Sequence, residues 1–125
     1  MSFRLQSNAA QISAQLQRRA SALVRATAFG IEGDIKTSMA EPKSGHIYGN
    51  HQASAPGESP AIDTGQLANS IQTVAEELSA TVGTNTEYAP YLEFGTHRMA
   101  SRPFMGPAFE RAKPEFEKGL KELIK

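Results

Sequence analysis

Apolar residues recur every three or four positions through roughly the first forty residues, as they do along one buried face of a helix. The positions are Leu5, Ala9, Ile12, Leu16, Ala20, Leu23, Ile31 and Ile35, with Thr27 keeping the spacing. We therefore expect one long helix from about Phe3 to Met39, ended by Glu41-Pro42 because the residue before a proline is pushed out of helical geometry. At about 1.5 Å per residue the helix would be about 50 Å long. We expect part of it to pack on a neighbouring subunit.

Residues 43–63 show neither helical nor strand periodicity and are punctuated by glycine and proline. A structureless loop of about 20 residues is uncommon in a small domain unless it has a function. Two interpretations stay open: a mobile surface loop, or an arm that becomes ordered on a partner. In the second, the residues expected to meet the partner are His46, Tyr48, His51, Pro56 and Pro60.

The middle of the chain predicts a short helix followed by a hairpin. Asp63 or Thr64 is a suitable N-cap for a helical turn that runs to about Ser70. Residues 70–76 and 79–84 then alternate loosely between apolar and polar, which predicts two half-buried antiparallel strands.

An aromatic segment and a final helix complete the pattern. Tyr88 to Phe94 is expected to form a short helix or an extended corner, rigid and buried, with Pro90 in its first turn. After a loop at 97–101, a helix capped by Ser101 is expected from about Pro103 to Ile124. Its apolar stripe is Phe104, Ala108, Ala112, Phe116, Leu120 and Leu123. Pro114 should kink this helix or divide it.

These elements predict a single α+β domain spanning residues 1–125. Its parts are a long helix (1–40), a mobile loop or arm (43–63), a hairpin with the aromatic corner (64–96) and a C-terminal helix (102–125). The 39% hydrophobic content supports one modest core. The absence of cysteine excludes disulfides and suits a reducing cytoplasm. No apolar run approaches the roughly 20 residues of a membrane span, and we expect no signal peptide.

Charge is balanced overall but uneven along the chain. The sequence has 13 basic and 13 acidic residues, and no lysine or arginine lies between Ser44 and Thr96. This distribution is either chance on solvated faces or a protomer with one acidic and one basic side, which would favour head-to-tail packing into a ring. It disfavours a strong nucleic-acid binder, because phosphate affinity needs a concentrated basic patch.

We find no constellation that predicts catalysis, a metal site or a bound cofactor. His46, His51 and His97 are the only imidazoles, and the first two lie five residues apart in a glycine-rich loop. That spacing does not align ligands on a helix, and a zinc site without cysteine would need all three histidines or carboxylates. No glycine loop carries the residues that cradle phosphate.

Glu93 is the one acid that the pattern singles out, because it lies between Leu92 and Phe94 in the corner expected to be buried. A partly buried carboxylate needs a partner. Arg102 is the expected one, in a salt bridge that fixes the corner. The corner and interface candidates are Tyr88, Tyr91, Glu93, Phe94, Gly95, Thr96, Arg102, Pro103 and Phe104.

Three motifs, in this order, carry a resemblance to a known family. They are Asp63-Thr64-Gly65-Gln66-Leu67 after a proline-rich loop, Glu93-Phe94-Gly95-Thr96, and Arg102-Pro103-Phe104. The chain, over about residues 45 to 110, resembles the gene-product-ten-like head–tail junction family of long-tailed double-stranded-DNA bacteriophages. These proteins are neck or tail-completion proteins, often minor tail components.

The resemblance implies a structural virion protein without enzymatic activity, made in the host cytoplasm and located at the head–tail junction. It implies an α+β fold and a ring, expected to be sixfold, through which DNA passes without specific binding. The implied partners are copies of the chain and the adjoining head-completion and tail-terminator or tail-tube proteins. The alternatives are a tail terminator or another minor tail protein and, from another class, a small soluble binding module from a prophage.

Overall fold

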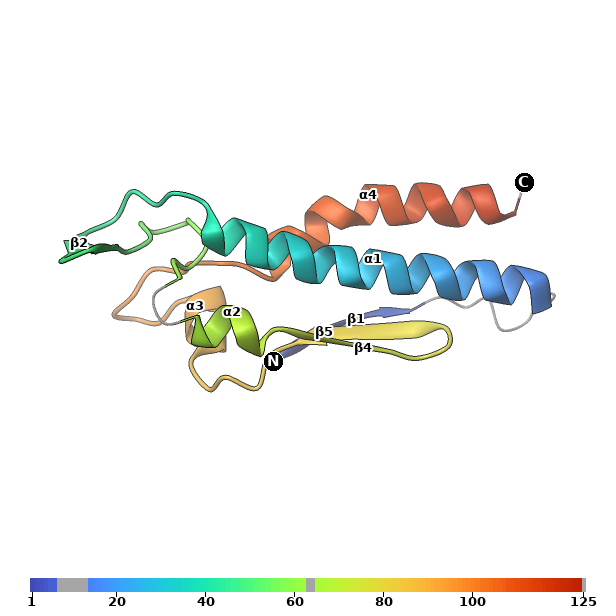
Figure 1. Ribbon diagram of the computed structural model, residues 1–125, viewed down its shortest axis with the longest axis horizontal. Helices are drawn as coiled ribbons and strands as arrows, with labels where there is room; N and C mark the ends of the chain where they lie inside the picture. Colours follow the sequence, from blue (N-terminus) through green and yellow to red (C-terminus); the bar gives the residue numbers. More distant parts are fainter. Residues whose placement is uncertain (7–13, 63–64, 125) are drawn as a thin grey trace.

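The computed structural model describes residues 1–6, 14–62 and 65–124. Two long helices lie side by side above a small antiparallel sheet, so the prediction of an α+β fold is confirmed (Figure 1). The helices are α1 (Ala14–Ala40), α2 (Gln66–Ser70), α3 (Ala89–Phe94) and α4 (Gly106–Leu123). The strands are β1 (Ser2–Gln6), β2 (Ile47–Tyr48), β3 (His51–Gln52), β4 (Gln72–Ala75) and β5 (Ser79–Gly83).

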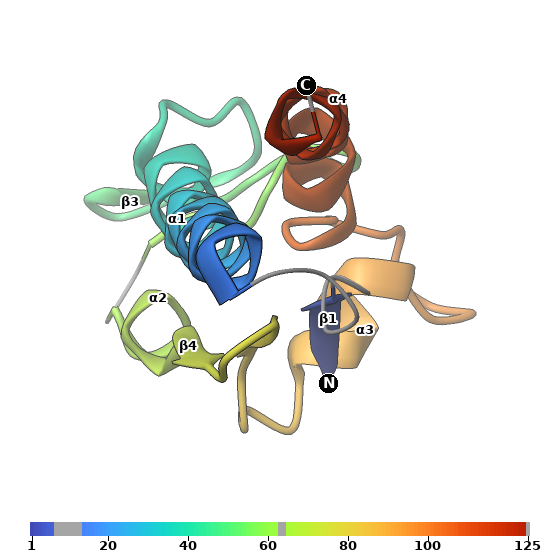
Figure 2. The same ribbon diagram turned by 90° about the vertical axis from the view of Figure 1, so that its right-hand side faces the viewer.

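The main sheet has the order β1-β5-β4, with β5 antiparallel to both neighbours. Ser2 and Gln72 both lie opposite Gly83, and Arg4 and Val74 both lie opposite Thr81. Seen end-on, β4 and β1 form the two edges of the sheet beneath α1 and α4 (Figure 2). One face of the sheet is therefore covered by helices and the other is open.

The expected first helix is wrong at its beginning, because Phe3 and Leu5 belong to strand β1. Phe3 and Leu5 lie two apart, which is the period of one face of a strand, and they pair with β5. The ring of Phe3 then packs at 4.8 Å from that of Phe109 on α4. Of the expected helical stripe, Ala9 and Ile12 lie outside the described residues.

The remaining helix, α1, has 27 residues and is therefore about 40 Å long rather than 50 Å. It buries a stripe that repeats every three or four residues against the sheet and α4: Ala20, Val24, Ala28, Ile31, Ile35 and Met39. Its first turns, up to Arg19, bury no residue. The packing of part of this helix on a neighbouring subunit stays a prediction.

Helix α4 lies along α1 and completes the core. Gly119 allows the close approach, because a Cβ there would lie 2.8 Å from a methyl carbon of Leu23. The Asp34 carboxylate accepts a hydrogen bond from Arg111 at 2.9 Å across the two helices. The helix starts at Gly106, later than expected, and it continues through Pro114 without dividing.

The hairpin prediction is confirmed by β4 and β5, whose inward residues include the buried Ala80 and Val82. The expected loop at 43–63 is wrong in one respect, since it contains the small antiparallel hairpin β2–β3. The expected cap residues of α2, Asp63 and Thr64, lie outside the described residues. Over the described chain, no helix combines the length and apolarity needed to cross a bilayer.

Candidate functional site

Five segments meet at one end of the molecule and form its candidate site. They are the C-terminal end of α1, residues 43–62 (from here on called the arm), helices α2 and α3, and the loop 95–103 (Figure 1). The site holds every corner and arm residue that the sequence singled out. The orientation of α3 decides which of these residues are exposed.

Helix α3 exposes its aromatic residues rather than burying them. Pro90 lies in its first turn, as expected, and Ala89 and Glu93 face the core. Tyr91 and Phe94 face outward and are 57% and 71% exposed, while Tyr88, just before the helix, is 40% exposed. The expectation of a buried aromatic corner is therefore wrong for these three rings, because a helix of six residues can turn only one side to the core. We call the three exposed rings the aromatic face.

The buried Glu93 binds the start of α4. Its Oε1 accepts hydrogen bonds from the backbone N–H groups of Phe104 and Met105 at 3.2 and 2.8 Å, and its Oε2 accepts one from Gly106 at 3.2 Å. The first N–H groups of a helix lack partners within the helix and carry partial positive charge. A carboxylate 11 to 13 residues away in sequence therefore caps α4.

Two expectations about this corner are corrected by that arrangement. Ser101 does not cap α4, which has no side-chain cap from its own N-cap residue. Arg102 is not the partner of Glu93: its backbone N–H donates to Leu92 O at 2.5 Å, and its buried Nε has no hydrogen-bond partner. Three helix N–H groups outcompete one guanidinium because they are already fixed in place when α4 forms.

The glycine of the Glu93-Phe94-Gly95-Thr96 motif ends α3 and starts a tight loop. Gly95 adopts φ +75° and ψ 177°, a conformation that other residues rarely adopt. A Cβ there would lie 2.9 Å from both Met99 O and Ser101 N. Thr96 and Met99 exchange backbone hydrogen bonds at 2.8 and 3.3 Å, which leaves the side chains of the residues between them exposed.

The Arg102-Pro103-Phe104 motif joins this loop to the core. Phe104 is among the largest fully buried side chains, and Pro103 is half-buried beside it. The loop is thus held at three points: the Gly95 turn, the contact from Arg102 N–H to Leu92, and the Glu93 cap. The backbone beneath the aromatic face is therefore fixed by these contacts.

The root of the arm is bound to the end of α1 and to the loop 95–103. Lys43 Nζ donates to Ser38 O and to Ser59 Oγ, both at 2.6 Å. A cation suits the unpaired carbonyl groups at a helix C-terminus. On the other side, Gly57 N–H donates to Ser101 O at 3.0 Å.

Glu58 closes the root of the arm on itself. Its carboxylate accepts hydrogen bonds from the Ala55 N–H at 2.7 Å and from the Ser44 N–H and Oγ at 3.1 and 2.8 Å. The Ala55 N–H, followed by the Ser44 groups, lowers the pKa of Glu58 below its usual value. Sequence reasoning missed this residue, and the signal for it was its place three residues after Ala55, as in a capped turn.

The tip of the arm is exposed and partly apolar. Ile47 and Tyr48 on β2 are each 63% exposed. The ring of His46 lies edge-on to that of Tyr48 at 4.4 Å. Of the other expected arm residues, Pro60 is buried, His51 is half-buried and Pro56 is exposed. The arm therefore has an ordered root and a projecting tip, and contact of this tip with a partner stays a prediction.

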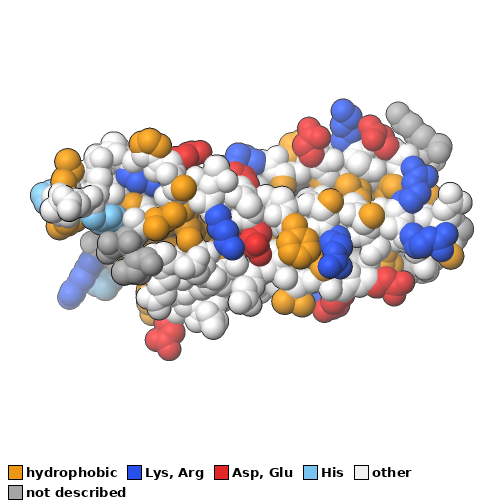
Figure 3. Space-filling model, in the orientation of Figure 1, with side chains coloured by type: hydrophobic (Ala, Val, Ile, Leu, Met, Phe, Trp, Pro, Cys, Tyr) orange, Lys and Arg blue, Asp and Glu red, His pale blue; other side chains and the backbone are white. Residues whose placement is uncertain are grey.

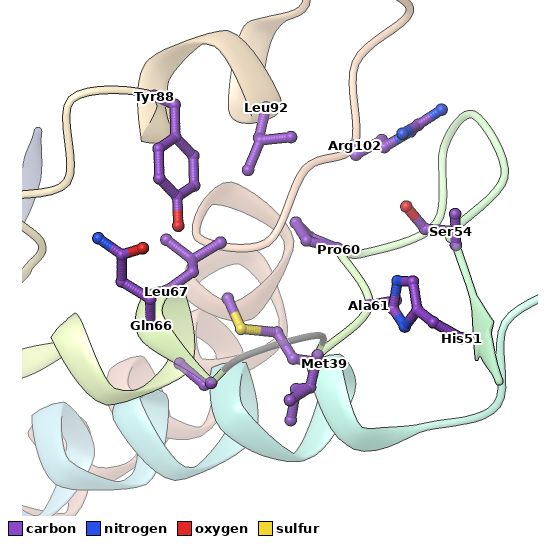
Figure 4. A pocket seen from close by; sticks show the side chains of 14 residues that line it. Met39, His51, Ser54, Pro60, Ala61, Gln66, Leu67, Tyr88, Leu92 and Arg102 are labelled. Atoms are coloured by element: carbon purple, nitrogen blue, oxygen red, sulfur yellow. The ribbon is translucent and has the colours of Figure 1, made fainter. Parts of the chain in front are cut away.

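A cavity of about 210 Å³ lies between the arm and helices α2 and α3. Tyr88 and Leu92 reach into it from α3, Leu67 from α2 and Met39 from the end of α1, while the Arg102 side chain points away (Figure 4). Its lining is mainly apolar, and His51 and Arg102 are the ionisable residues in that lining. A lining of this kind supports packing and the binding of an apolar group.

The described ranges contain no group of three or more histidine, cysteine, aspartate or glutamate residues placed to hold a metal ion.

The charge blocks of the sequence interleave in space. Glu76, from the acidic middle block, lies 3.6 Å from Arg4 of the N-terminal block. Acidic and basic side chains also alternate over α1 and α4 on the face shown in Figure 3. The two signs are mixed on this face, because the hairpin folds back onto the N-terminal strand, and a protomer with one acidic and one basic side stays a prediction.

Comparison with known proteins identifies the family. A family model described as "Bacteriophage HK97-gp10, putative tail-component" matches residues 3–95, which covers β1 through the Gly95 turn. Searches of curated proteins and of solved structures returned no match. The matched segment includes the arm, the β4–β5 hairpin and α3 with its aromatic face. The chain therefore belongs to the HK97-gp10-like family of bacteriophage tail components.

Proposed function

We propose that this tail component is a structural protein of the head–tail junction, where copies form a ring around the DNA channel. The adjoining layer of the junction, a head-completion protein or a tail-terminator or tail-tube protein, binds the aromatic face and the tip of the arm. The observation that carries this proposal is the exposure of five apolar side chains at one end of the molecule: Ile47, Tyr48, Tyr88, Tyr91 and Phe94.

The energetics favour these residues as anchors of an interface. Burying one large apolar side chain contributes about 1.5–3 kcal/mol, and tyrosine is enriched among the residues that dominate binding. Helix α3 is already held by Glu93 and Gly95. Little ordering entropy therefore opposes binding through the aromatic face.

The sixfold symmetry of the ring and the lack of enzymatic activity rest on the family resemblance. The passage of DNA without specific binding has one structural support. On the open face of the sheet, the exposed Arg4 is neutralised by Glu76, and the neighbouring strand residues are uncharged: Ser2, Gln72, Val74, Thr81 and Gly83. A surface of this kind offers little affinity for phosphate.

The test is the double variant Tyr91→Ser/Phe94→Ser. Both rings are exposed, so the free energy of unfolding should change by less than about 0.5 kcal/mol. In a phage whose own copy of the gene is deleted, the variant should fail to join heads to tails and should be missing from purified particles. The measurements are infectivity, electron microscopy and immunoblots of particles.

The control is Phe29→Ser, which removes an exposed ring from the middle of α1, away from the site. It should leave infectivity and incorporation unchanged. Normal joining by a stable Tyr91→Ser/Phe94→Ser variant would contradict the role of the aromatic face.

A further inference from the structure

Both edges of the main sheet are open to another strand. β4 and β1 are the outer strands, and among the residues that the structure describes each is paired only with β5. Within the described chain, no backbone group of Gln72–Ala75 or Ser2–Gln6 bonds to a segment on the outer side of either strand. Open edges present rows of unpaired N–H and C=O groups, which are templates for strand addition.

The edge strand β4 lacks the usual protection against such pairing. Its sequence, QTVA, contains no charged residue and no proline, and no bulge interrupts its register with β5. Val74 is 61% exposed on the open face. Proteins usually block an edge with lysine, proline or a bulge. An unprotected edge therefore indicates a surface that is covered in the assembled state.

The other edge of the same sheet matches β4 in length, direction and charge. β1 and β4 have five and four residues and are parallel to each other, since both are antiparallel to β5. β1 carries the cation Arg4 at its centre, and β4 is followed by Glu76. Arg4 already reaches across β5 to Glu76 within one chain, at 3.6 Å. If β1 of a second copy lies beside β4, its Arg4 is one strand away from Glu76 and therefore within reach of that carboxylate.

We propose that β1 of one copy pairs in parallel with β4 of the next, so that the three-stranded sheets join into one continuous sheet. This inference rests on the proposed ring and supplies its subunit contact. The contact is heterologous, because two different edges meet, and a heterologous contact closes into a ring when its rotation permits. The aromatic face takes no part in it and remains free for the adjoining layer.

Paired cysteines test the contact directly, since the natural chain has none. Ser2 and Gln72 are exposed and lie opposite the same residue of β5. Two strand spacings, about 9.6 Å, separate them within one chain, which exceeds the roughly 7 Å limit for a disulfide. In neighbouring copies one strand spacing of about 4.8 Å separates them. A disulfide in Ser2→Cys/Gln72→Cys therefore forms only between copies.

The full chain carrying this pair is oxidised and run on a non-reducing gel. A second variant, Ser2→Cys/Val74→Cys, is treated in the same way and tests a register shifted by two residues. We expect a ladder of covalent oligomers for whichever of the two double variants matches the register. Mixing the two corresponding single-cysteine variants should give only dimers. Ser2→Cys/Lys118→Cys, with its second cysteine exposed on α4, is the matched control and should give no ladder. A charge test complements it: Val74→Lys should weaken self-association several-fold, and Val74→Glu should not.

Light scattering and electron microscopy of the same variants separate the possible failures. Rings that form without cross-links in either pair would overturn the strand contact and leave the proposed ring intact. Efficient dimers from Gln72→Cys alone, with no additional dimer when Ser2→Cys is mixed in, would show β4 pairing with β4 and overturn the head-to-tail arrangement. Cross-links to a different virion protein would overturn the assignment to a second copy. No self-association, in solution or in particles, would overturn both the contact and the ring.

Discussion

Removing the carboxylate of Glu93 should destabilise the whole domain, although this residue is far from α4 in sequence. Glu93 is only 7% exposed and accepts hydrogen bonds from the N–H groups of Phe104, Met105 and Gly106. Glu93→Ala leaves all three without a partner. Gly106 is half-exposed, so water can replace one bond, but Phe104 and Met105 are buried.

The expected magnitude follows from those two buried donors. A buried donor left unpaired costs about 1–3 kcal/mol, so Glu93→Ala should lower the free energy of unfolding by about 3–4 kcal/mol. Glu93→Gln keeps an oxygen for the two buried N–H groups, but it loses the charge and turns an N–H₂ donor toward the Gly106 N–H, so it should cost about 1–2 kcal/mol. For a helix cap, the free energy of unfolding should rise in the order Glu93→Ala, Glu93→Gln, wild type.

Urea unfolding at neutral pH, followed by circular dichroism, measures the effect. At a slope of about 1.5 kcal/mol per molar urea, the midpoint for Glu93→Ala should fall by about 2 M. Glu87→Ala removes an exposed acid just before α3 and should change stability by less than about 0.5 kcal/mol. If Glu93→Ala cost no more than this control, or if amide exchange at Met105 were unchanged, the cap would not stabilise the fold as described.

Two further changes address the loop and the arm. Gly95→Ala should cost about 2–3 kcal/mol by thermal unfolding, because the backbone there disfavours any Cβ and the added atom would meet Met99 O at 2.9 Å. Gly33→Ala has open space around it in α1 and should instead stabilise by about 0.5–1 kcal/mol; equal effects at the two glycines would refute the conformational argument. The Glu58 pKa is lowered on folding by the Ala55 N–H and then by Ser44, so its stabilisation of the arm is present above the unfolded pKa and is lost as pH falls through the lowered folded pKa. Amide exchange at Ala55 should accelerate on acidification in that range but not in Glu58→Gln, and acid-independent exchange in the wild type would contradict this.

The sequence by itself determined the elements whose periodicity is long and whose ends are marked. α1 from Ala14 onward, the β4–β5 hairpin, the short α3 with Pro90 in its first turn and the helix α4 were all predicted, as was their α+β class. Local signals suffice there because helical and strand spacing reflect burial on one side. The motifs around Glu93, Gly95 and Phe104 also marked the site, since glycine and buried acids occupy positions that other residues cannot.

The tertiary structure alone decided which partner each of these residues meets. Phe3 and Leu5 form a strand because β5 offers an edge, and two apolar residues cannot signal that edge. Glu93 binds the start of α4 rather than Arg102, and the aromatic rings of α3 point outward, because packing fixes the rotation of a short helix. The pairing of Arg4 with Glu76 likewise brings together charges that lie in separate blocks of the chain. Each outcome depends on contacts between segments that are distant in sequence. Local sequence patterns report which residues are buried, but not which distant segment they contact.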